Sequence, residues 1–61
     1  MSKAISDADL CEGMVIAMEP VAWENVNSPS AEPDPEDGVR VLRATRHALA
    51  AIQWLHEEGV I

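Results

Sequence analysis

Three side chains in this sequence are soft or borderline metal ligands that can also act as a nucleophile or a base: Cys11, His47 and His56. The two histidines are nine residues apart, so a helix that contained both would present them on different faces. No CxxC or HxxxH spacing occurs, and a lone cysteine excludes a disulfide within the chain. The sequence therefore predicts neither an enzyme nor a protein with a metal or another cofactor.

A second group of residues has the chemistry to bind phosphate. Arg40, Arg43, Arg46 and His47 form the only basic cluster, and Trp54 follows as a stacking surface for a base. The favourable four-residue spacing from Glu36 to Arg40 explains part of this cluster as pairing within a helix. Because the formal net charge of the chain is −7, repulsion from phosphate backbones argues against nucleic-acid binding.

The acidic residues suggest the opposite function, imitation of DNA. Residues 1–38 contain one lysine and nine acids, whereas residues 39–61 contain three arginines and two acids. Acids spaced along a surface can imitate phosphates and occupy a nucleic-acid-binding protein. Most of these acids also fit ordinary helix caps or a loop, so mimicry remains an alternative.

These residues must be positioned by helices. Ser6 as N-cap, with Asp9 three residues later, predicts a first helix over residues 7–25. Gly13 and Pro20 count against an unbroken helix, and we expect a kink at Pro20. A short buried strand over residues 13–20 is the alternative, because the apolar run there has no decisive period.

A proline-rich acidic segment, residues 26–34, predicts a loop. Asp34 as N-cap and Pro35 in the first turn then predict a second helix over residues 35–58, which Gly59 ends. The expected fold is all-α, a two-helix antiparallel hairpin within a single domain over residues 1–61. Two copies are expected to dimerise into a four-helix arrangement.

Helical projection divides the face-forming residues of the two predicted helices into two sets. The first set is expected to form the core or the dimer interface: Leu10, Met14, Met18, Val21, Val41, Leu49, Ile52 and Leu55. The second set lies on outer faces and is expected to bind a partner: Ile16, Trp23, Arg40, Arg43, His47 and Trp54. For Trp23, the bend at Pro20 leaves a place in the core equally open.

A chain of 61 residues is short for a self-sufficient core, which favours a homodimer or a protein partner. No signal peptide or membrane span is evident, so we expect a cytoplasmic protein that binds neither membrane nor nucleic acid. Small acidic chains of this kind look like the accessory proteins with which phages and other mobile elements inhibit host proteins. We therefore expect a protein-binding modulator, with a structural or assembly subunit as the alternative.

Overall fold

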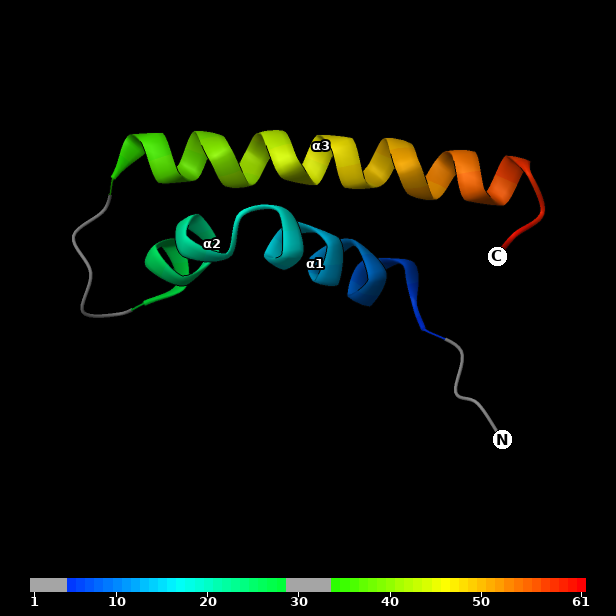
Figure 1. Cartoon of the computed structure of the whole chain (residues 1–61), viewed down its shortest axis with the longest axis horizontal. Coiled ribbons are helices and arrows are strands. Elements are labelled where there is room, and N and C mark those ends of the chain that lie inside the picture. The colour runs from blue at the N-terminus through cyan, green and yellow to red at the C-terminus, as the bar shows by residue number, and fades with distance from the viewer. Residues whose placement is uncertain (1–4, 29–33) are drawn as a thin grey trace.

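The computed structural model describes residues 5–28 and 34–61, and these residues form helices without a strand. Helix α1 spans Asp7–Met18, α2 spans Pro20–Asn27 and α3 spans Pro35–Glu57. Figure 1 shows α1 and α2 one after the other along α3, and both pack against it. The all-helical prediction is confirmed for this part of the chain, and the alternative of a strand over residues 13–20 is wrong.

The predicted single helix over residues 7–25 is divided into two. Glu19, which lies between α1 and α2, has φ −136° and ψ 66°, because the residue before a proline avoids the helical region. Pro20 has no N–H to continue α1, but it suits the first turn of α2. Proline therefore breaks the helix where a kink was expected. The new helix also includes Val26 and Asn27, which were predicted as loop, and residues 29–33 of that loop lie outside the described residues.

The predicted helix ends are largely confirmed. The Ser6 hydroxyl accepts the Asp9 N–H at 3.1 Å, and the Asp34 carboxylate accepts the Glu36 N–H at 2.9 Å. At the other end of α3, Gly59 adopts φ 74°, while the N–H of Val60 donates to the carbonyl of Leu55 at 2.9 Å. This is a Schellman motif, which requires a residue in the left-handed region.

The core is small and is made largely of alanine. Within residues 5–28 and 34–61 the buried hydrophobic side chains are Val15, Ala22, Ala44, Ala48 and Ile52. Alanine at the contact lets α1 and α2 approach α3 closely, but each buried methyl removes little apolar surface from water.

The residues expected in the core or the dimer interface differ in burial within the single chain. Ile52 is buried, while Leu10, Met14, Val41 and Leu55 are half-buried. Met18, Val21 and Leu49 are exposed at 43%, 69% and 54%, so they lie outside the core of the single chain. Ala44, which was not assigned to any apolar face, is buried in their place because it forms a cluster with Ala48 and with Val15 of α1.

Candidate protein-binding surface

One side of α3 combines cationic, imidazole and indole side chains, and we call it the near face. It includes Arg43, His47 and Trp54, which follow at spacings of four and seven residues along one side of the helix. Trp54 is 57% exposed, which confirms the expectation that it points away from the core. An exposed indole on a rigid helix is a typical feature of a binding surface.

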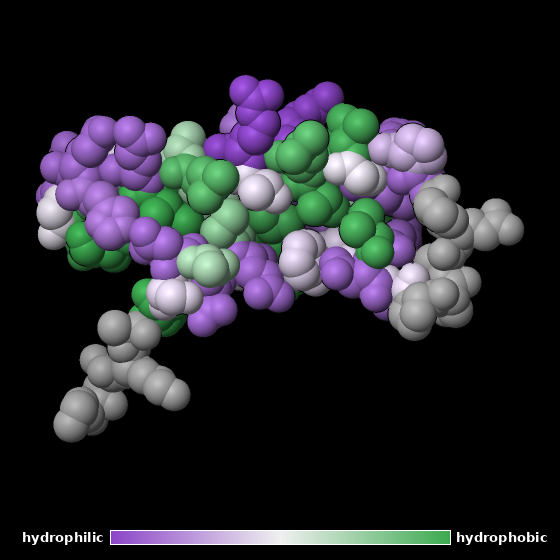
Figure 2. All heavy atoms as spheres, turned by 180° about the vertical axis from the view of Figure 1, so that it is seen from behind, coloured by the Kyte–Doolittle hydropathy of each residue, from purple (hydrophilic) through white to green (hydrophobic). Residues whose placement is uncertain are grey.

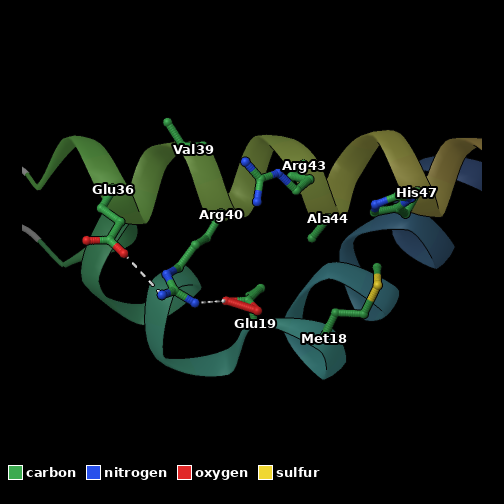
Figure 3. A pocket seen from close by; sticks show the side chains of 8 residues that line it. All are labelled: Met18, Glu19, Glu36, Val39, Arg40, Arg43, Ala44 and His47. Atoms are coloured by element: carbon green, nitrogen blue, oxygen red, sulfur yellow. Dashed lines mark hydrogen bonds and ion pairs between the residues drawn. The ribbon is translucent and has the colours of Figure 1, made fainter.

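A groove of about 330 Å³ adjoins this face between the α1–α2 junction and α3. Figure 3 shows Met18 from α1 pointing towards α3 at one end, with His47 and Arg43 above the groove. Ala44 forms part of its wall, and Val39 lies at the opposite end from His47. The groove thus combines thioether and aliphatic surface with cationic and imidazole groups.

Arg40 connects α3 to the break between α1 and α2. Its guanidinium lies 3.1 Å from the Glu36 carboxylate and 3.5 Å from that of Glu19, as Figure 3 shows. The hydrogen bond and charge of Glu36, followed by those of Glu19, raise the pKa of Arg40 above its ordinary value. Arg40 was expected to bind a partner, but in the single chain it is engaged in orienting Glu19 against α3.

Two further contacts join the ends of the molecule. His56 Nε2 lies 3.0 Å from Asp7 Oδ2, where α1 begins, and the Asn25 side-chain amide donates to Asp37 at 3.1 Å. All four groups are near the surface, so each contact adds little stability. Together they define the register in which α1 and α2 lie along α3.

The other tryptophan has a different environment. Trp23 is half-buried and packs against the cluster of Val15, Ala44 and Ala48. The break at Glu19 rotates α2 relative to α1. The sequence left the core and an outer face equally open for Trp23, and the structure packs it against the core. Ile16, its expected companion on that face, is 38% exposed and stays at the surface. The structure therefore separates the two residues.

Cys11, His47 and His56 lie in three different environments. Cys11 packs against the core cluster, His47 lines the groove, and His56 pairs with Asp7. Among residues 5–28 and 34–61, no three histidine, cysteine or acidic side chains group closely enough to hold a metal ion.

No protein-family model, curated protein or solved structure matches this chain significantly. None of the helices in residues 5–28 and 34–61 has the length and apolar character needed to cross a bilayer.

Proposed function

We propose that this chain is a non-enzymatic modulator that binds another protein through the near face of α3. In this proposal the chain acts as a dimer of antiparallel helical hairpins, in a four-helix arrangement. The observation that carries the proposal is the excess of exposed over buried apolar residues. Large hydrophobic side chains are exposed along all three helices, whereas three of the five residues that are buried within the described part of the chain are alanines.

The near face supports the proposal because its residues suit a binding hot spot. Tryptophan and arginine are the residue types that most often dominate binding energy, and here they project from the same rigid helix. The adjacent groove offers Met18 and Val39 for apolar contact and Arg43 for an acidic group. A target segment that carries both apolar and acidic side chains fits this combination.

Identification of the target and a matched pair of variants test this proposal. A photo-crosslinking residue at Ala51, exposed on α3 near Trp54, should capture the target in cells of the native host. Trp54→Ala should then weaken target binding at least about 30-fold, the effect of a hot spot of about 2 kcal/mol. Gln53→Ala, at the neighbouring exposed position, should leave binding within about twofold.

Circular dichroism distinguishes lost binding from lost structure. Arg43→Glu should abolish capture of the target. Helicity should stay unchanged in both Arg43→Glu and Trp54→Ala, because glutamate and alanine are good helix formers and both positions are exposed. Equal capture by wild type, Trp54→Ala and Arg43→Glu would contradict the proposed surface.

An assembly subunit is the second candidate, because self-association would also cover the exposed apolar residues. Native mass spectrometry separates the two functions. A closed dimer in which Trp54 fluorescence remains that of a solvent-exposed indole fits a binding protein. Higher assemblies with a blue-shifted Trp54 spectrum fit a structural subunit.

A further inference from the structure

The molecule is a slab one helix layer thick. Its extents between Cα atoms are 41 × 25 × 13 Å, and α1 and α2 share a single layer with α3. Stable small domains bury apolar faces between two packed layers. Figure 2, the view from behind, shows apolar side chains gathered across the middle of the slab, over both α3 and α1. We call this surface the far face.

Projection identifies the residues on the far face. Leu49 follows His47 by two residues and therefore lies about 160° around α3 from it, while His47 lines the groove beside the near face. Leu42 lies one heptad before Leu49, on the same side of the helix. Ile16 precedes Met18 by two residues on α1 and is likewise turned away from the groove. Leu42, Leu49 and Ile16 are 63%, 54% and 38% exposed.

α1 and α2 are acidic, whereas the acids of α3 lie only at its ends, at Glu36, Asp37 and Glu57. Residues 5–28, which include α1 and α2, contain five acids and no lysine or arginine. Residues 38–56 of α3 contain three arginines and no acid. On the far side of α1, Asp9 and Glu12 accompany Ile16, and on α3 Arg46 lies between Leu42 and Leu49 in sequence. The surface of α1 is thus complementary to that of α3.

We infer that the far face binds a second copy of this chain, with α1 of each copy packed on α3 of the other. This inference deepens the proposed function by giving the dimer its surface and leaving the near face free for a target. A two-fold axis parallel to the helices produces this crossed pairing in both halves at once. The acidic stripe of each α1 then meets the arginine-bearing stripe of the partner's α3.

The register within one chain locates the expected ion pair. Asp7 pairs with His56 and Glu19 with Arg40, so residues whose numbers sum to about 61 lie at the same level. The two-fold axis preserves this level, which places Glu12 of one copy near Leu49 of the other. Arg46 is three residues away, within one helical turn of about 5.4 Å, so its long side chain can reach that carboxylate.

The available surface is sufficient for such an interface. A stable dimer buries about 800 Å² on each partner. The accessible surface of the chain is 4892 Å², so this area is about one-sixth of it. One broad face of a thin slab readily provides that fraction.

Charge reversal with sedimentation equilibrium tests the crossed pairing. Arg46→Glu places two acids together at each crossed contact, and Glu12→Arg places two cations there, so each variant should raise the dimer Kd at least about tenfold. The double variant should restore the Kd to within about threefold of wild type. A mixture of the two single variants should form a heterodimer, because both of its crossed contacts are then complementary.

Unchanged dimerisation of both single variants would overturn the crossed pairing. It would instead fit a dimer in which α1 packs on α1, because like charges meet there both before and after each reversal. The weakest specific dimer expected here has a Kd of about 100 µM. A wild-type chain that stays monomeric at protein concentrations of about 100 µM would therefore overturn the dimer itself. Leu49→Asp should give a folded monomer by circular dichroism. If that monomer still binds the target, the proposed function stands independently of the dimer.

Discussion

Val15 offers the clearest test of where the core lies, because among residues 5–28 and 34–61 it is the largest side chain that is fully buried, at 1% exposure. Val15→Ala removes two methyl groups, each worth about 0.8 kcal/mol of burial, and leaves a cavity beside Ala44 and Ala48. The higher helix propensity of alanine offsets about 0.5 kcal/mol. The expected net loss in the free energy of unfolding is about 2 kcal/mol.

Val21→Ala is the matched control. The chemistry and the gain in helix propensity are the same, but Val21 is 69% exposed on α2. We expect its free energy of unfolding to stay within about 0.5 kcal/mol of wild type. Both variants are compared by urea unfolding at 222 nm and one fixed protein concentration, because a dimer would make stability depend on concentration.

The melting temperatures provide a second measurement. For a domain of this size, about 2 kcal/mol corresponds to a decrease of about 8–16 °C for Val15→Ala. A domain of this length has a total stability of only about 3–9 kcal/mol, so this loss is a large part of it. An equal or larger loss in Val21→Ala would refute the packing of α1 on α3 described above.

The remaining predictions concern the helix junction and ends. Pro20→Ala should allow α1 and α2 to join, which turns Trp23 out of the core and shifts its fluorescence to longer wavelength; an unshifted spectrum would mean that packing alone maintains the break. Gly13→Ala should raise the stability by about 1 kcal/mol, because a Cβ there meets no neighbour. Gly59→Ala should lower it by about 1 kcal/mol, because φ 74° disfavours other residues. Opposite signs in urea unfolding check this pair. Arg40→Ala should lower the melting temperature slightly at low salt and not at 1 M salt, since its ion pairs are exposed.

Local signals were the most informative part of the sequence. The predicted start of α3 at Pro35 is confirmed, and its predicted end at residue 58 differs by one residue from Glu57, because caps and prolines act through bonds to the nearest backbone groups. The exposure of Trp54 was also predictable, since α3 is uninterrupted and its faces repeat regularly. The surface around Arg43 and His47 follows from the same periodicity.

The orientation of the residues in α2, after the break at Glu19, could not be predicted from local signals. The direction of α2 depends on the φ and ψ angles that Glu19 adopts, and a projection of one continuous helix cannot contain that rotation. The sequence therefore left Trp23 equally open between an outer face and the core, and the structure packs it on the core. Leu49 was expected in the core or the dimer interface, and it is exposed in the single chain. The choice between neighbouring positions around a helix depends on how closely another helix approaches.

The sequence alone thus determined the N-caps Ser6 and Asp34, the extent of α3 and the outward direction of Trp54, because hydrogen bonding and periodicity act over a few residues. Only the tertiary structure decided that alanines occupy the contact between α1 and α3 and that the groove opens between Met18 and Val39. Those features depend on the distance and rotation between helices that are far apart in the chain. The volumes of the side chains on both helices set the distance between them, so the sequence pattern of one helix does not predict that distance.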